Sequence, residues 1–145
     1  MIWFLRHAEA EDGSPDAERP LTERGREQAA AAGRALANMD VPIDACVTSP
    51  KLRARDTAAL ACRALGVEPA EDRRLEGGPF EPREVVAGRG EHVLVVGHDP
   101  DLSLIVNRLT GAQVRMQKGG VAGEDRGELK ILLGPSELSS LARAR

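Results

Sequence analysis

Aromatic side chains are scarce in this sequence, whose 145 residues contain no tyrosine, two phenylalanines and one tryptophan. A surface that stacks nucleobases needs aromatic faces, so the composition argues against binding of nucleic acid in that way. The net charge of −3 at pH 7 also argues against a general attraction to nucleic acid or to an anionic membrane. We therefore expect neither as a partner, and we expect a core built from aliphatic side chains.

Cysteine is also rare, and its two positions exclude several kinds of site. Cys46 and Cys62 do not form a CxxC pair, and neither is followed by arginine at the spacing of a cysteine-phosphatase loop. Each lies in an apolar stretch, which predicts a buried, reduced thiol. No segment approaches the length of a membrane span, and Met1 leads into a strand-like run rather than a signal peptide. These features predict a cytoplasmic protein.

Short apolar runs typical of buried strands alternate along the chain with stretches typical of helices. The runs lie at residues 2–5, 43–48 and 92–96, and the helical stretches lie at residues 22–39, 49–65 and 101–110. This alternation predicts an α/β fold, a three-layer α/β/α sandwich around a mostly parallel sheet. The length fits one domain over residues 1–145.

Capping signals delimit the three predicted helices. Thr22 is a typical N-cap, and Ser49-Pro50 and Asp99-Pro100 each combine a capping side chain with proline at the first helical position. Gly66 and Gly111 predict the ends of the second and third helices.

The rest of the chain predicts smaller elements. We expect a short helix, then a pair of strands that forms an antiparallel edge with a glycine-rich turn between them, and finally a short surface helix. These elements lie at about 82–88, at 113–117 and 128–133 around Lys118-Gly119-Gly120, and at 135–145.

Charged and nucleophilic side chains follow the three predicted strands. Arg6-His7 ends the first strand, Ser49-Pro50 follows the second with Arg53 one turn further on, and His98 ends the third. The carboxyl ends of parallel strands share one edge of a sheet, which is where ligands bind. Two of these positions also lie at helix N-termini, which favour anions. We therefore expect a pocket for a tetrahedral dianion.

His7 is the candidate nucleophile of that pocket. A neutral imidazole needs no base to deprotonate it, and its second ring nitrogen should donate to a carbonyl or carboxylate. Arg6 and Arg53 would neutralise the phosphoryl oxygens, and a protonated His98 would do so from the far side. With arginines adjacent, a metal site is disfavoured, and we expect no metal or other cofactor.

Five stretches of the chain carry a resemblance to a known family. They are LRHAEA at 5–10, ERPLTERG at 18–25, SPKLRARDT at 49–57, VVGHDP at 95–100 and KGGV at 118–121. With these stretches in this order, the chain resembles the histidine phosphatase superfamily, which is phosphoglycerate mutase-like in fold, and closely its SixA-like phosphohistidine phosphatase branch.

The resemblance implies roles for individual residues. It implies that His7 is phosphorylated and that Arg6, Arg53 and His98 complete the phosphate pocket. Arg19 lies where the branch carries an arginine near the pocket mouth, so it is expected to bind substrate. We expect the same of Ser49 at the helix start.

The general acid of this chemistry is the least defined part. Ala8 and Asp56 stand where the family often has Gly and Gln, and the segment at 67–91 is too short for the insertion in which relatives carry an acidic proton donor. Glu9 and Asp99 are weak candidates. A solvated loop acid is the simpler interpretation of Glu9, as an N-cap is of Asp99.

A missing acid bears on the substrate. A phosphomonoester leaves as an alkoxide unless an acid protonates it, whereas phosphohistidine leaves as an easily protonated imidazole. We therefore predict a metal-independent phosphatase that acts on phosphohistidine of a protein. The alternatives are a general phosphomonoesterase that takes a small phosphorylated substrate, and a non-catalytic module that binds a phosphorylated protein.

Overall fold

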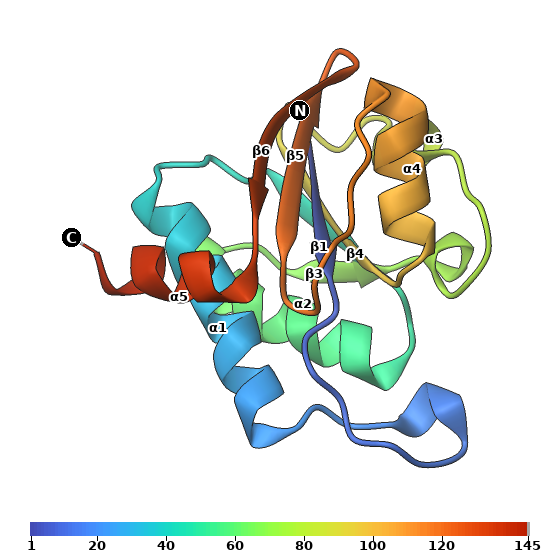
Figure 1. Cartoon of the computed structure of the whole chain (residues 1–145), viewed down its shortest axis with the longest axis vertical. Coiled ribbons are helices and arrows are strands. Elements are labelled where there is room, and N and C mark those ends of the chain that lie inside the picture. The colour runs from blue at the N-terminus through green and yellow to red at the C-terminus, as the bar shows by residue number, and fades with distance from the viewer. Residues whose placement is uncertain (145) are drawn as a thin grey trace.

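Six strands and five α-helices make up the computed structural model, which describes residues 1–144 (Figure 1). The strands are β1 (Ile2–Arg6), β2 (Ala45–Thr48), β3 (Pro69–Glu71), β4 (Val93–Gly97), β5 (Val121–Asp125) and β6 (Glu128–Leu133). The helices are α1 (Glu23–Asn38), α2 (Leu52–Leu65), α3 (Pro82–Val86), α4 (Asp101–Thr110) and α5 (Pro135–Arg143), with 3-10 turns η1 (Asp16–Glu18) and η2 (Arg73–Leu75). No helix within residues 1–144 is long and apolar enough to cross a bilayer.

The strands form one sheet in the order β3-β2-β4-β1-β5-β6. The pairs β3-β2, β2-β4 and β4-β1 are parallel, while β5 runs antiparallel to both β1 and β6. The predicted α/β fold, with a mostly parallel sheet and an antiparallel edge, is confirmed.

Alternation along the central strand divides the core into two layers. Trp3 and Leu5 of β1 belong to the cluster that α1, α2 and α5 cover, whereas Ile2 and Phe4 belong to the cluster under α3 and α4. Figure 1 shows these two groups of helices on opposite faces of the sheet. Because successive side chains of a strand point to opposite faces, a strand that is buried on both sides reads as the continuous apolar run seen in the sequence.

Two predicted boundaries are corrected by the structure. The second helix begins at Leu52, not at Ser49-Pro50, because the Ser49 hydroxyl accepts from the Lys51 N–H at 3.2 Å and closes a turn before the helix. The strand predicted at 113–117 is absent, and its place in the antiparallel pair is taken by β5. The turn of that pair is Arg126-Gly127, where both residues have positive φ (50° and 82°), as a tight hairpin requires. The segment Lys118-Gly119-Gly120 therefore precedes the hairpin.

Helices α1 and α2 approach each other closely at a glycine. A Cβ on Gly33 would lie 2.1 Å from the carbonyl oxygen of Ala61, so only hydrogen fits between the two backbones. Alanine and glycine therefore supply the contact between these helices, consistent with the Ala-rich sequence of α1.

The substitution Gly33→Ala tests this contact. Within a helix, Gly→Ala normally stabilises by about 0.5–1 kcal/mol, but here the methyl group meets backbone that must move. We expect the free energy of unfolding to fall by about 1–3 kcal/mol, measured by urea unfolding. Arg34→Ala, at the exposed neighbouring position, is the control and should change it by less than about 0.5 kcal/mol. A Gly33→Ala protein as stable as wild type would contradict the packing.

Candidate active site

The two histidines meet because β1 and β4 are neighbours in register. Arg6 lies opposite Gly97 in the parallel pairing, so the residues that follow the two strands emerge side by side. The His7 N–H donates to the Gly97 carbonyl at 2.9 Å, and the rings of His7 and His98 have centroids 5.2 Å apart. Strand β2 adds Ser49 on the other side of β4, where the Ser49 N–H donates to Val96 at 3.0 Å.

His7 is held as a neutral imidazole with one nitrogen free. Its Nδ1 lies 2.8 Å from the carbonyl oxygen of Ala8, which fixes the proton on Nδ1 and leaves the Nε2 lone pair available. The side chain is buried, and this burial, together with the charges of Arg53, Arg6 and Lys118, lowers the pKa of His7 to about 4. At neutral pH the ring is therefore an unprotonated nucleophile that needs no separate base.

His98 is also buried and neutral. Its Nε2 lies 2.8 Å from the Ser49 hydroxyl, and burial lowers its pKa to about 3, helped by repulsion from His7 in its protonated form and from Arg53. The sequence led us to expect a protonated His98. The structure places a neutral ring there, and an adjacent phosphoryl dianion would be needed to favour the charged form.

One buried and one partly buried arginine flank the histidines. Arg53, in the first turn of α2, donates from Nη1 to the Asp16 carbonyl at 2.8 Å and from Nη2 to the Asp16 carboxylate at 3.2 Å. Arg6 donates from Nη1 to the Met116 carbonyl at 2.8 Å. These contacts hold both side chains in place, and neither contact involves the Nε atom.

Three buried donors of this cluster have no acceptor among the residues described. They are Arg6 Nε, Arg53 Nε and His98 Nδ1, the last provided that its ring carries a proton there. A buried polar atom without a partner is uncommon and costs free energy. The arrangement therefore suits an anion with several acceptor oxygens next to His7 Nε2.

The glycine-rich segment before β5 supports the strand that carries the nucleophile. The Gly119 N–H lies within 3.2 Å of the carbonyl oxygens of Arg6 and His7, and the Arg6 N–H donates to Gly120 at 3.1 Å. The φ of +77° at Gly119 favours glycine. The Lys118-Gly119-Gly120 segment is thus a turn that brackets the end of β1, and Lys118 adds positive charge near His7.

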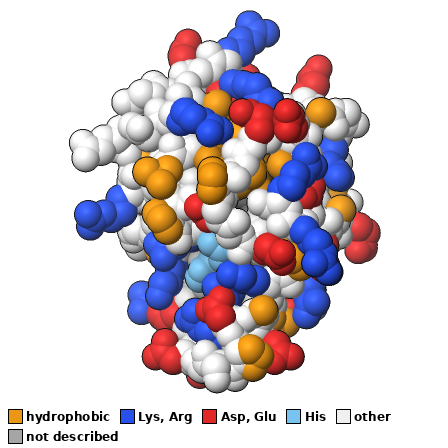
Figure 2. All heavy atoms as spheres, turned by 90° about the vertical axis from the view of Figure 1, so that its right-hand side faces the viewer, with side chains coloured by type: hydrophobic (Ala, Val, Ile, Leu, Met, Phe, Trp, Pro, Cys, Tyr) orange, Lys and Arg blue, Asp and Glu red, His pale blue; other side chains and the backbone are white. Residues whose placement is uncertain are grey.

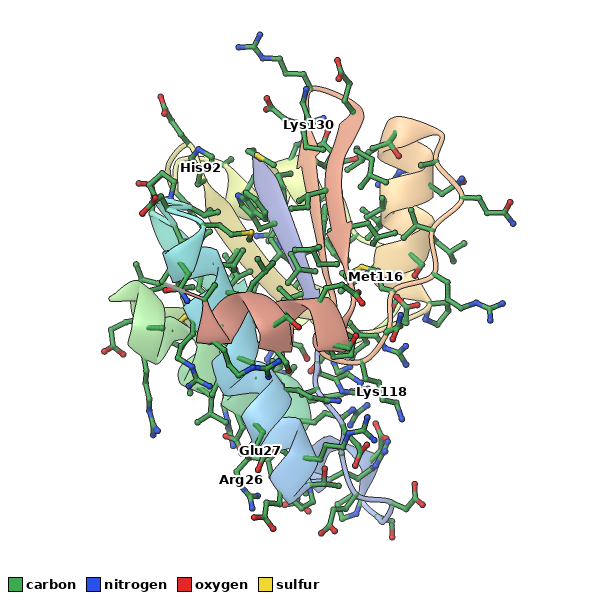
Figure 3. The ribbon with its side chains drawn as sticks, turned by 60° about the vertical axis from the view of Figure 1, so that its left-hand side comes forward. Arg26, Glu27, His92, Met116, Lys118 and Lys130 are labelled. Atoms are coloured by element: carbon green, nitrogen blue, oxygen red, sulfur yellow. The ribbon has the colours of Figure 1, made fainter. Side chains whose placement is uncertain are left out.

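His92 lies far from these groups, toward the opposite end of the sheet from Lys118 (Figure 3). Its Nδ1 accepts from the Trp3 indole N–H at 3.1 Å, which is a structural contact. On the face drawn in Figure 2, histidine atoms form a small patch with basic and acidic side chains around it. His7 and His98 are only 6% and 7% exposed.

The weaker site candidates are placed around the cluster rather than in it. Ser49 is fully buried against His98, so its hydroxyl can orient that ring. The Glu9 carboxylate accepts from the Thr22 hydroxyl at 2.9 Å and pairs with Arg24, at the start of α1. The Asp99 carboxylate accepts from the N–H and hydroxyl of Ser103 at 3.0 and 2.6 Å, in α4.

Asp16 and Thr57 are two site residues that the sequence did not indicate. Asp16 Oδ1 pairs with Arg19 at 3.1 Å, and its Oδ2 pairs with Lys51 and with Arg53, both at 3.2 Å. Arg19 thus reaches the mouth of the site through Asp16. The spacing Asp16-x-x-Arg19 was the available signal, but it is too common in turns to be informative alone.

Thr57 links the nucleophile segment to α2. Its hydroxyl donates to the Arg53 carbonyl at 2.7 Å and accepts from the Ala8 N–H at 3.0 Å. One side chain therefore ties the residue after His7 to the helix that carries Arg53. Within residues 1–144, no group of three or more His, Cys, Asp or Glu side chains is placed to hold a metal ion.

Comparison with known proteins places this arrangement in a family. Residues 2–84 match the family model described as the histidine phosphatase superfamily (branch 1). An uncharacterized protein of Picosynechococcus sp. is 31% identical over 144 residues, which cover 90% of this chain and 87% of that protein. The human mitochondrial serine/threonine-protein phosphatase PGAM5 is 38% identical over 84 residues, 56% of this chain but only 29% of that protein.

Solved structures with the same fold cover nearly the whole chain. A SixA structure from Nakamurella multipartitia is 27% identical with a TM-score of 0.79, covering 92% of this chain and 95% of that chain. The protein histidine phosphatase SixA complexed with tungstate is 21% identical with a TM-score of 0.81, at 94% and 98% coverage. The alpha-ribazole phosphatase of Shigella flexneri is also 21% identical, with a TM-score of 0.69 and 92% and 96% coverage.

The buried neutral histidines predict a loss of stability on mild acidification. Between pH 7.5 and pH 5 an unfolded histidine, with pKa about 6.5, takes up a proton, while His7 and His98 stay neutral in the folded protein. The unfolded state binds more protons, so each ring lowers the free energy of unfolding by about 2 kcal/mol at pH 5. Urea unfolding at both pH values should show His7→Asn losing about 2 kcal/mol less than wild type. Equal losses would contradict a buried neutral His7.

Removal of the Thr57 hydroxyl should lower both the stability of the protein and its affinity for phosphate. Thr57→Val keeps the shape of the side chain but leaves the buried Ala8 N–H without its acceptor, so the free energy of unfolding should fall by about 1–3 kcal/mol. The affinity for inorganic phosphate, measured by calorimetry, should fall by about tenfold because Arg53 and the His7 segment lose their common anchor. Thr57→Ser retains the hydroxyl and should behave like wild type. If Thr57→Val bound phosphate normally, the link would have no functional role.

Proposed function

Since this chain belongs to the histidine phosphatase superfamily, we propose that it is a phosphatase that forms a phosphohistidine at His7 and takes phosphoryl groups from histidine side chains of a protein. The single observation that carries the proposal is the set of three buried donors without acceptors, Arg6 Nε, Arg53 Nε and His98 Nδ1, beside a neutral His7. A phosphoryl group supplies the oxygens that these donors lack.

The first step is an in-line displacement by His7. Nε2 forms a bond to phosphorus while the bond from phosphorus to the leaving atom breaks, and that electron pair departs with the leaving group. Arg6 and Arg53 hydrogen-bond the equatorial oxygens, over which charge is spread in the transition state. The Ala8 carbonyl keeps the Nδ1 proton in place, so the ring becomes a phosphorylated cation.

In the second step, water attacks phosphorus and the bond to Nε2 breaks. The Nδ1 proton is still held by the Ala8 carbonyl, so His7 departs as a neutral imidazole rather than as an anion. The hydrogen bond that selects the nucleophilic tautomer thus also makes His7 a good leaving group. The product phosphate then dissociates, and the enzyme returns to its starting state.

The absence of a placed proton donor supports phosphohistidine as the substrate. Among the residues described, Glu9 is engaged at the start of α1 and Asp99 within α4. A hydroxyl leaving group needs an acid, which contributes about 10²–10⁴-fold, whereas imidazole leaves readily. The structural neighbours include a protein histidine phosphatase whose complex holds tungstate, a tetrahedral oxyanion, and they also include an alpha-ribazole phosphatase. A small phosphomonoester is therefore the second candidate.

A substrate panel tests the proposed function. A phosphohistidine peptide, a phosphoserine peptide, a sugar phosphate and an aryl phosphate are assayed with EDTA present. We expect the highest kcat/KM for the phosphohistidine peptide, and a loss of more than about 10³-fold on every substrate in His7→Ala. Base-quenched samples of wild type should contain an acid-labile phosphoenzyme that His7→Ala lacks.

The control is His92→Asn, at the far end of the sheet, which should leave kcat and KM unchanged. If wild type cleaved the sugar phosphate or the phosphoserine peptide faster than the phosphohistidine peptide, the substrate would instead be a phosphate ester. Full activity in His7→Ala would overturn the mechanism itself.

A further inference from the structure

One carboxylate lies at the mouth of a site that is otherwise built for anions. The Asp16 side chain, in η1, is about half exposed (54%) and bridges Arg19, Lys51 and Arg53. These three cations hold the pKa of Asp16 well below its usual range, so the group is an anion at neutral pH. It cannot serve as a proton donor to a leaving group.

A fixed negative charge here has a cost for phosphate binding. It repels the phosphoryl dianion and occupies Nη2 of Arg53, which would otherwise be free for a phosphate oxygen. Anchoring of Arg53 does not require the carboxylate, because the Asp16 backbone carbonyl already accepts from Nη1 at 2.8 Å. A cationic group on the substrate would convert this repulsion into an attraction.

The ring of a phosphorylated histidine is such a group when its second nitrogen is protonated. We propose that Asp16 is a specificity-determining residue that accepts a hydrogen bond from the ring N–H of a phosphohistidine substrate and favours the protonated ring. This inference rests on the proposed function and concerns the same site. The half-exposed carboxylate remains accessible from solvent, the side from which a side chain on another protein would enter.

The proton balance explains what the contact would contribute. When the substrate ring carries a proton on its far nitrogen, the P–N electron pair goes to the near nitrogen and neutral imidazole departs directly. No donor to the leaving atom is required. The positive ring charge passes to His7, whose Nδ1–H and new Nε2–P bond make it the cation. The two imidazoles exchange one phosphoryl group and one charge, and no proton moves.

An alkoxide leaving group gains nothing from Asp16. A phosphoserine, sugar or aryl ester has no N–H at that position, so the carboxylate only repels its phosphoryl group. Asp16 would therefore favour P–N over P–O cleavage in two ways, by attracting the protonated ring of phosphohistidine and by repelling phosphate esters, which lack a positive charge.

The charged and titratable groups that face Asp16 come from several elements of the fold. Arg19 belongs to the loop after η1, Lys51 precedes α2, Arg53 lies in α2, and His98 at the end of β4 is close enough for its pKa to respond to Asp16. With a pKa of about 3, His98 is neutral throughout the alkaline range. A shift of the alkaline limb between wild type and Asp16→Asn therefore does not come from His98, and we assign it to the substrate ring.

The decisive experiment compares Asp16→Asn on two substrates, a phosphohistidine peptide and an aryl phosphate, over a range of pH. The amide keeps the size of the side chain and the backbone contact to Arg53. We expect kcat/KM for the phosphohistidine peptide to fall by about 10- to 100-fold, as for loss of a hydrogen bond to a charged group, while aryl phosphate is unchanged or improved. The alkaline limb for the peptide should move to lower pH by about one unit.

Two further variants keep the result interpretable. Glu18→Gln removes a carboxylate from the same 3-10 turn and should match wild type, and Asp16→Glu should retain part of the preference. Equal losses on both substrates with an unmoved alkaline limb would show that Asp16 only positions Arg53 and would overturn this inference alone. A wild-type enzyme that prefers aryl phosphate would instead overturn the proposed phosphohistidine substrate, and this inference with it.

Discussion

The parallel pairing of β1 with β4 is the constraint on which the site depends. With Arg6 opposite Gly97, the next residue of each strand is a histidine, and the two rings come within 5.2 Å without help from a loop. A slip of one residue in this register would turn every core side chain of β1 to the opposite face. The site and the core are therefore fixed by the same hydrogen bonds.

Burial does for His7 what a general base does for other nucleophiles. Two arginines and a lysine near the ring oppose its protonation, and the low-dielectric surroundings oppose it further, so a lone pair is available at any physiological pH. In the proposed mechanism, the same positive charges stabilise the phosphoryl group that the lone pair attacks. One set of residues would then both set the protonation state and bind the substrate, so a small domain would suffice for the chemistry.

Much of this was predictable from the sequence. IWFL and VLVV are apolar without interruption because β1 and β4 are covered on both faces. Arg6-His7 follows the first run directly, and His98 follows the second after Gly97. The superfamily and its SixA-like branch, predicted from five stretches, agree with the family match and the SixA structure from Nakamurella. The edge hairpin was misplaced because Val114 and Met116 look like strand residues but pack against the cluster under α4, and the Arg126-Gly127 turn was overlooked.

The position of Asp16 in the site could not be predicted from the sequence, for a different physical reason. Its neighbours Lys51 and Arg53 lie more than thirty residues further along the chain, so only the folded loop reveals that the acid is surrounded by cations. A phosphate pocket can be inferred from its positive charges, since each arginine or histidine adds to the same attraction. A negative charge that sets selectivity opposes that attraction, so counting the cations in the sequence does not reveal it. In our proposal, Asp16 leaves the phosphoryl dianion less tightly held than it would otherwise be. The repulsion is useful only if the preferred substrate brings a positive charge of its own, and among phosphorylated side chains a protonated histidine ring does so.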